Sequence, residues 1–340
     1  MSEQEKINIY VPREVGELLD SDNEMFEVFK RDGRTLNRNQ FLTQLVTGYY
    51  DVYARELQAK SEAILQALSP LHADRKTCEQ VVSTLLEEIS LPRTSKRVGR
   101  NAMQFSLKPT NKTETLISRI RGEIENNDYV SRYFVRMLTS YSEKPFSQRE
   151  RIVFKDNYEI LAACCKKQHP VYFVTTANKH DVHEVVPYKI TTGQEEMYNY
   201  LLCQVENEQT HQPEARAYRL NRIRGINRSE KAAILQDDVK QRLEVMRKQG
   251  PQYAINDEME VCVRLTPKGR GMYNKIYFGR PAYFREENKA DGCYQYYQCS
   301  HNQLELYFRR FGAEAEVISP ESLRNKMVEF YRLASLAYNG

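Results

Sequence analysis

The feature that most constrains the fold of this 340-residue chain is an internal repeat in its first half. The segments 39–49 (NQFLTQLVTGY) and 131–141 (SRYFVRMLTSY) carry apolar residues at the same helical positions, and both end on tyrosine. A short segment of alternating apolar and polar residues precedes each copy, at 6–12 and at 103–107. We therefore predict that a strand–helix–helix unit occurs twice in this chain.

Each predicted strand has one apolar face, formed by Ile7, Ile9 and Val11 in the first and by Met103, Phe105 and Leu107 in the second. Two such strands cannot stand alone in water, so we expect them to pair antiparallel and to share one core. The arrangement resembles the ribbon-helix-helix fold, in which a two-stranded ribbon enters the DNA major groove. The alternative is a plain helical domain with two incidental strands.

The ribbon-helix-helix resemblance covers 6–30, 37–50 and 102–142, with a helical insert between, and implies a pseudo-dimer fused into one chain. It also implies that polar residues on the outward face of the ribbon are candidate nucleic-acid contacts. These are Asn8, Tyr10, Gln104, Ser106 and Lys108.

The composition is that of a soluble globular protein, with 41% hydrophobic and 28% charged residues. Apolar runs are far too short for a membrane span, and the N-terminus lacks the apolar core of a secretory signal, so we expect no membrane partner and a cytoplasmic location. The seven cysteines form no CxxC pair. We expect reduced thiols and no metal or other cofactor.

The net charge is only +4, but cations are clustered along the chain. One cluster without an acid consists of Arg93, Lys96, Arg97 and Arg100, and a second consists of Arg216, Arg219, Arg222, Arg224 and Arg228. Such clusters attract phosphate backbones even when the net charge is small. The alternative is a pair of ordinary solvated faces.

The second half of the chain changes its pattern. Residues 143–156 are polar and predict a linker, and 157–167 predict a short helix. Period-two alternation then predicts four short strands, at 171–174, 183–190, 197–205 and 215–223, which suggest a small β-barrel. We expect an α+β chain with a helical domain at 1–145, a barrel at 157–228, a linking helix at 229–250 and an extension at 251–340.

The predicted barrel resembles the WYL domain, an Sm- or SH3-like fold that serves as a sensor of nucleic-acid or nucleotide ligands in bacterial regulators. Three segments carry the resemblance: the strand Val171-Tyr172-Phe173; HEVVPYKI, with His183 where the family has Arg, and with Pro187; and RAYRLNRIRGI. The family's Trp-Tyr-Leu appears here as Asn199-Tyr200-Leu201.

Arginines and tyrosines of this segment are the predicted nucleic-acid site. On one continuous strand, positions 216, 218, 220, 222 and 224 would share a face. Guanidinium groups bind phosphate and stack on bases, and tyrosine rings offer stacking surfaces. The predicted site comprises Tyr172, His183, Tyr200, Arg216, Tyr218, Arg219, Arg222 and Arg224. The alternative places the tyrosines in the barrel core and leaves the arginines as solubilising surface residues.

The last 90 residues predict a strand at 259–265, a glycine-rich basic loop at 268–271 and an amphipathic helix. The spacing of Phe311, Gly312, Ala315, Val317, Pro320, Leu323 and Met327 resembles the extension that follows WYL domains and often pairs subunits. Apolar residues at helical spacing from 323 to 336 leave more apolar surface than a small module can bury. We therefore expect a homodimer.

No catalytic motif is present, and we expect no enzyme: His183-Glu184 lacks the second histidine of HExxH, and Lys268–Gly271 is not a P-loop. The whole chain resembles the WYL accessory proteins of type VI-D, RNA-targeting CRISPR systems. This resemblance implies a homodimer that binds single-stranded RNA and stimulates RNA cleavage by the effector. Two alternatives are a DNA-binding transcriptional regulator whose WYL domain senses a nucleic-acid or nucleotide ligand, and an assembly protein without nucleic-acid contact.

Overall fold

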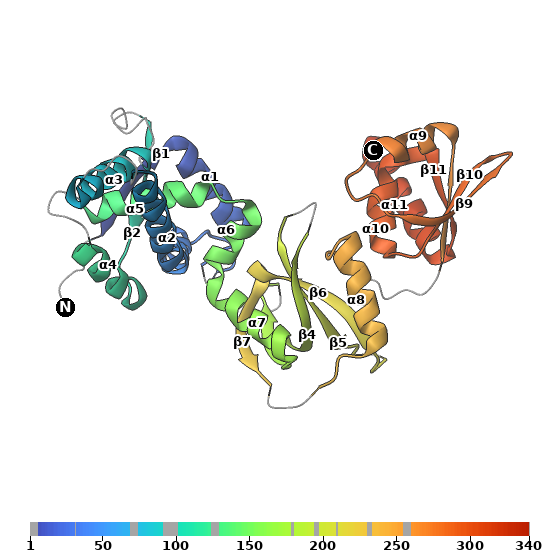
Figure 1. The fold of residues 1–340 in the computed structure, drawn as a ribbon. Coiled ribbons are helices and arrows are strands. Elements are labelled where there is room, and N and C mark those ends of the chain that lie inside the picture. Colours follow the sequence, from blue (N-terminus) through green and yellow to red (C-terminus); the bar gives the residue numbers. More distant parts are fainter. Residues whose placement is uncertain are drawn as a thin grey trace. The chain divides into compact units, whose positions relative to one another are not determined.

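A computed structural model describes residues 6–30, 32–68, 74–90, 101–123, 129–177, 180–193, 197–208, 210–229, 233–253 and 260–339. The chain forms two compact units, Met1–Glu159 and Ile160–Gly340. The fold is α+β, with helices beside three antiparallel sheets (Figure 1). Across these residues, no helix is both long enough and apolar enough to cross a membrane.

The N-terminal unit contains the predicted repeat. Its elements are β1 (Ile7–Pro12), α1 (Arg13–Met25), α2 (Arg38–Leu68), α3 (Arg75–Ser90), β2 (Ala102–Leu107), α4 (Asn111–Glu123), α5 (Val130–Ser142), α6 (Phe146–Val153) and the start of α7 (Lys155–Lys167). β1 pairs antiparallel with β2, and Ile9 lies opposite Phe105. The predicted antiparallel pairing is confirmed; the ribbon-helix-helix class stays a prediction.

The two copies of the repeat bury equivalent positions. The apolar residues that match in α2 and α5 are all buried: Phe41 with Tyr133, Leu42 with Phe134, Leu45 with Met137, Val46 with Leu138, and Tyr49 with Tyr141. Even a polar detail recurs, because the Thr47 hydroxyl donates to the Thr43 carbonyl at 2.7 Å and the Thr139 hydroxyl donates to the Val135 carbonyl at 2.8 Å. The repeated sequence thus specifies one packing arrangement used twice.

The predicted linker at 143–156 is wrong, because α6 and the start of α7 occupy it. Pro145 immediately precedes α6, where its missing N–H costs no helical hydrogen bond. Arg149 of α6 forms a bidentate ion pair with the buried Asp22 of α1, at 2.7 and 2.9 Å. Tyr141 donates a third hydrogen bond to Asp22 at 2.7 Å. The polar character of the segment therefore reflects a buried ion pair.

The second unit begins with the end of α7 and continues into a five-stranded sheet. The strands are β3 (Val171–Thr175), β4 (Val182–Thr192), β5 (Asn199–Glu206), β6 (Pro213–Arg219) and β7 (Ile223–Arg228), in the spatial order β6-β5-β4-β3-β7. The first strand therefore lies beside the last. The Sm- or SH3-like class stays a prediction.

Two predicted elements of this region have different bounds in the structure. The strand predicted at 215–223 ends at Arg219, because a 3-10 turn (Leu220–Arg222) inserts the side chain of Leu220 into the core before β7 begins. The helix predicted at 229–250 begins only at α8 (Asp237–Gln249). Its apolar residues Val239, Leu243 and Met246 are fully buried and pack in a cluster with Leu202 of β5.

The C-terminal module contains β8 (Val261–Leu265), α9 (Pro267–Lys275), β9 (Tyr283–Lys289), β10 (Gly292–Tyr297), α10 (His301–Phe308), a 3-10 segment (Arg309–Glu314), β11 (Ala315–Ser319) and α11 (Glu321–Asn339). Its sheet has the order β11-β8-β10-β9. An aromatic core of Tyr297, Tyr307, Phe308 and Phe311 joins the sheet to α10.

The glycine-rich loop predicted at 268–271 is part of helix α9, so this prediction is wrong. The Thr266 hydroxyl caps the helix by accepting a hydrogen bond from the Gly269 amide at 3.0 Å. A Cβ atom at Gly269 would lie 2.1 Å from the carbonyl oxygen of Glu314. Gly269 thus permits a close approach between the helix and the neighbouring segment. This glycine therefore serves helix packing and does not mark a loop.

Candidate nucleic-acid interface

The residues predicted for the nucleic-acid site lie on β3 to β7 and on the 3-10 turn. Five of the eight line one hollow of the sheet domain: His183, Tyr200, Tyr218, Arg219 and Arg222. We call this the arginine hollow. It holds two guanidinium groups beside four rings, because Tyr253 also lines it. This is the combination that binds phosphate and stacks bases.

Tyrosine side chains orient Arg219 within the arginine hollow. Its Nε donates to the Tyr200 hydroxyl at 3.1 Å, and its guanidinium carbon lies 4.4 Å from the ring centroid of Tyr198. Tyr200 itself is only 3% exposed. It is therefore a core residue that positions the arginine. This agrees with the alternative prediction that the tyrosines lie in the core of the domain. Sequence reasoning missed Tyr198, although it stands two residues before Tyr200.

The 3-10 turn separates the arginines that we expected on one strand face. Leu220 and Asn221 are buried in the turn, so positions 216 to 224 do not share one face and that prediction is wrong. Arg224 lies beyond the turn, and its Nη1 donates to the carbonyl oxygens of Asn221 and Ile223 at 2.6 and 2.8 Å. This guanidinium therefore braces the turn itself.

A ring cluster forms one wall of the arginine hollow. The centroid of Tyr218 lies 5.0 Å from that of Phe173 and 5.2 Å from that of His183. Edge-to-face and tilted contacts of this kind are favourable and fix ring orientation. His183 and Tyr218 line a second pocket as well, so the two pockets meet at these rings.

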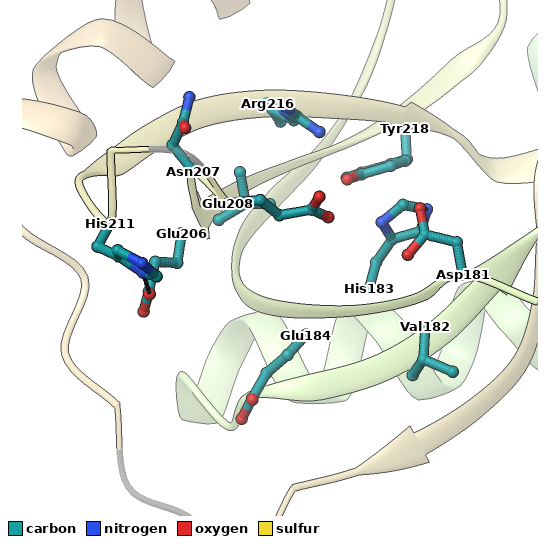
Figure 2. Close-up of a pocket in the computed structure, with 11 residues that line it drawn as sticks. Asp181, Val182, His183, Glu184, Glu206, Asn207, Glu208, His211, Arg216 and Tyr218 are labelled. Carbon is teal, nitrogen blue, oxygen red and sulfur yellow. Dashed lines mark hydrogen bonds and ion pairs between the residues drawn. The ribbon is translucent and has the colours of Figure 1, made fainter.

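The second pocket has a volume of about 770 Å³ and is acidic (Figure 2). Its lining includes Asp181, Glu184, Glu206 and Glu208, against the single arginine Arg216. His211 Nδ1 lies 2.8 Å from a carboxylate oxygen of Glu206. Carboxylates repel phosphate, so the acidic pocket disfavours a nucleic-acid backbone. The arginine hollow favours one.

Tyr218 points its hydroxyl into the acidic pocket (Figure 2). That hydroxyl is buried and makes no hydrogen bond within the part of the chain that the structure describes. Burial raises the pKa of Tyr218 to about 12, with the nearby Arg216 acting in the opposite direction. The phenol is therefore neutral near pH 7 and presents a donor to the pocket.

Tyr172 lines neither of these two pockets. Its hydroxyl donates to Glu184 at 2.8 Å and accepts from Ser229 at 3.3 Å. These bonds tie β3 to β4 and to the end of β7. The structure thus brings together most of the predicted site. Tyr172 and Arg224 are exceptions, because Tyr172 links neighbouring strands and Arg224 stabilises the 3-10 turn.

On the β1–β2 ribbon, the candidate contacts lie side by side on the exposed face. Asn8 Oδ1 accepts hydrogen bonds from Gln104 Nε2 at 3.1 Å and from Ser106 Oγ at 2.8 Å. Tyr10 and Lys108 are exposed beside them. Only Lys108 among these five residues is charged. The cationic cluster at 93–100 lies outside the described residues.

Among the described residues, no group of three or more His, Cys, Asp or Glu side chains could hold a metal ion. Burial raises the pKa of the Cys165 thiol to about 12 and raises that of Cys203 even further. Both thiols are therefore protonated near neutral pH, which disfavours them as nucleophiles.

Comparison with known proteins gives a fold relationship. The chain is similar to a crystal structure described as that of a CRISPR Cas-related protein, with a TM-score of 0.70 and 18% identity over 98% of this chain and 94% of that one. A proteasome accessory factor B/C of Arthrobacter aurescens is similar over 70% of this chain and 37% of that one, but its TM-score of 0.28 and identity of 13% are too low for a shared fold to follow. No family model and no curated protein matches the sequence.

Proposed function

We propose that this protein is a non-enzymatic, cytoplasmic accessory factor of a CRISPR system, which binds single-stranded RNA and stimulates RNA cleavage by the effector. The observation that carries the proposal is the arginine hollow. Arg219 and Arg222 would bind the phosphates of a single strand there, while the rings of Tyr218 and His183 would stack its unpaired bases.

The contrast between the two pockets supports this proposal. Among the described residues that line it, the arginine hollow has no acidic side chain, and the acidic pocket adjoins it at Tyr218 and His183. A polyanion would therefore be attracted to one side and repelled from the other, which would give a bound strand a defined path. The shared fold with a CRISPR Cas-related protein is consistent with a role in such a system.

The second candidate is a DNA-binding transcriptional regulator whose sheet domain senses a nucleic-acid or nucleotide ligand. The β1–β2 ribbon would then read the major groove. We favour the first candidate because only Lys108 is charged among the five candidate contacts of the ribbon, and their amide and hydroxyl groups are bonded to one another. Neutralising many phosphates needs more cations than this face offers.

The proposal includes a homodimer formed through α11. The first half of α11 buries Leu323 and Met327 in the module's core, but Val328, Leu333 and Leu336 are more than half exposed. A second copy of the same helix would cover these residues in a symmetric dimer. Two copies would present two arginine hollows to one RNA, which increases the apparent affinity for long strands.

The test is a cleavage assay with a purified RNA-targeting effector, its guide RNA and a labelled target RNA. Addition of this protein should increase the cleavage rate, and the double variant Arg219→Ala, Arg222→Ala should stimulate less. Arg13→Ala is the matched control, because it also removes a cation, one paired with Glu17 on the surface of α1. An unchanged cleavage rate with the wild-type protein would contradict the proposed function.

A further inference from the structure

A second basic and aromatic segment lies in the C-terminal module, outside the lining of the arginine hollow. The 25 residues from Val261 to Arg285 contain no acid, and their cations are Arg264, Lys268, Arg270, Lys275, Arg280 and Arg285. The same segment contains the aromatic residues Tyr273, Tyr277, Phe278, Tyr283 and Phe284. Interleaved cations and aromatic rings are typical of surfaces that bind single-stranded nucleic acids.

Four of these rings are exposed on the loop between α9 and β9 and at the start of β9. Tyr277 is 70% exposed, Phe278 is 56% exposed, Tyr283 is 40% exposed and Phe284 is 53% exposed. Clustered exposed rings of this size usually mark a binding surface. We call Tyr277, Phe278 and Tyr283, together with Arg280 and Arg310, the aromatic platform.

The cations of the module fall into two classes. Arg264, Lys268, Arg270 and Arg285 each form an ion pair with an acidic side chain of the module. Arg280 and Arg310 form no ion pair with any acid in the portion of the chain that the structure covers. Arg280 and Arg310 are therefore two cations without an acidic partner that lie beside exposed rings.

Both of these arginines lie over rings of the platform. The guanidinium carbon of Arg280 is 4.6 Å from the Tyr277 centroid, and that of Arg310 is 5.7 Å from the Phe278 centroid. Each pair offers a flat surface with a positive charge at its side. A base could stack on the ring or the guanidinium, while the adjoining phosphate meets the charge.

Buried residues fix the loop that carries the platform. The Tyr307 hydroxyl donates to the Ile276 carbonyl at 2.8 Å, and the Tyr273 hydroxyl donates to the Pro281 carbonyl at 2.7 Å. Arg310 Nη1 donates to the Phe278 carbonyl at 2.9 Å. Gly279 adopts a φ of +72°, which a glycine tolerates without strain. The loop backbone that carries the rings is thus held in place before any ligand binds, which reduces the entropic cost of binding.

We infer that the aromatic platform is a second binding site for single-stranded nucleic acid, in which Tyr277, Phe278 and Tyr283 stack unpaired bases and Arg280 and Arg310 bind the adjoining phosphates. The ring faces select single strands because the bases of a duplex are already stacked on one another. This inference deepens the proposed function, on which it rests, by assigning a second site on the same strand.

The chain contains no tryptophan, so one introduced tryptophan reports on its own surroundings. In the full-length Tyr277→Trp variant, we expect single-stranded RNA to quench the fluorescence, and an abasic strand of equal length to bind without quenching. Tyr129→Trp is the control, because Tyr129 is exposed on the other unit of the chain and should report no quenching. The same measurement with single-stranded DNA shows whether the platform distinguishes ribose from deoxyribose.

Affinity measurements complete the test. The Tyr277→Ala variant should bind a base-containing strand about 5- to 150-fold more weakly, which corresponds to the loss of one stacked base. It should bind the abasic strand as the wild type does. The Arg280→Ala variant should bind the base-containing strand and the abasic strand more weakly by the same factor, because both strands contain phosphates.

The outcomes separate the two proposals. If the wild type binds single strands and Arg219→Ala weakens that binding, but the Tyr277→Trp fluorescence stays unquenched, this inference is wrong and the proposed function stands. The exposed rings would then serve a protein contact. If the wild-type chain binds no single strand at all, both the inference and the proposed function are overturned.

Discussion

Arg219 donates its Nε–H to the hydroxyl of Tyr200 across β6 and β5, at 3.1 Å. The tyrosine is buried, so the guanidinium is held at its Nε where Arg219 lines the arginine hollow. A guanidinium group that is already fixed loses less entropy on binding a phosphate than a freely rotating side chain does. This relationship leads to the first prediction.

Substituting either arginine of the hollow should weaken RNA binding. Arg219→Ala and Arg222→Ala should each reduce the binding free energy for single-stranded RNA by about 1–3 kcal/mol, and should lower the slope of log affinity against log salt by about one. Fluorescence anisotropy across a salt series measures both quantities, with Arg13→Ala as the charge-matched control. Two variants indistinguishable from wild type would show that the site lies elsewhere.

Two glycines in helices of the N-terminal unit should respond oppositely to alanine. A Cβ at Gly48 would lie 2.0 Å from the Ile152 carbonyl oxygen, so Gly48→Ala should destabilise the unit by about 1–3 kcal/mol by separating α2 from α6. Gly122 in α4 has nothing within 4 Å of that position, so Gly122→Ala should stabilise it by about 0.5–1 kcal/mol. Urea denaturation of the two variants measures the difference, and equal responses would refute the close packing of α6.

Stability should fall steeply in alkali. Burial raises the pKa of Tyr53, Tyr218 and Tyr273 to about 12, above the ordinary value of 10.0. Between these values the unfolded chain binds fewer protons than the folded chain, so the free energy of unfolding decreases as pH rises from about 10 to about 12 and is unaffected by these groups below that window. Absorbance at 295 nm reports phenolate in this tryptophan-free chain, and circular dichroism reports folding. Titration of all tyrosines near pH 10 with the fold intact would be the contrary result.

The exposed half of α11 should mediate dimerisation. Replacing Leu333 and Leu336 with glutamate should convert a dimer into a monomer, because neither side chain is needed in the core of its own module. Light scattering of the full-length chain measures the mass. The Val328→Ser variant should weaken the dimer without abolishing it. A double variant that remains dimeric would place the interface on another surface.

The N-terminal architecture could be predicted because it is encoded locally. Apolar periodicity identified both copies of the repeat, and the alternation of Ile7, Ile9 and Val11 identified the strand face that is directed inward. The segment around Arg149 could not be understood in this way. Its partner Asp22 is 127 residues away, and an ion pair between distant residues leaves no periodic signal.

The candidate site could be predicted in composition but not in geometry. An arginine-rich alternation is the same in sequence whether the strand continues or is broken by a three-residue turn, so the sequence did not indicate that Arg224 lies outside the arginine hollow. Likewise Gly269 suggested a loop, whereas its small size serves the contact with Glu314. The local sequence pattern determines whether a residue lies in a helix or a strand. Tertiary contacts of this kind then determine which role the residue has.

The central claim is that the chain recognises single-stranded RNA. The most direct measurement is a filter-binding comparison of single-stranded RNA, single-stranded DNA of the same sequence and duplex DNA at one salt concentration. The account predicts that the single-stranded RNA binds most tightly, and that Arg219→Ala and Arg222→Ala weaken its binding more than they weaken any binding of the duplex. Tightest binding of duplex DNA, unaffected by these two substitutions, would contradict the account and favour a DNA-binding regulator.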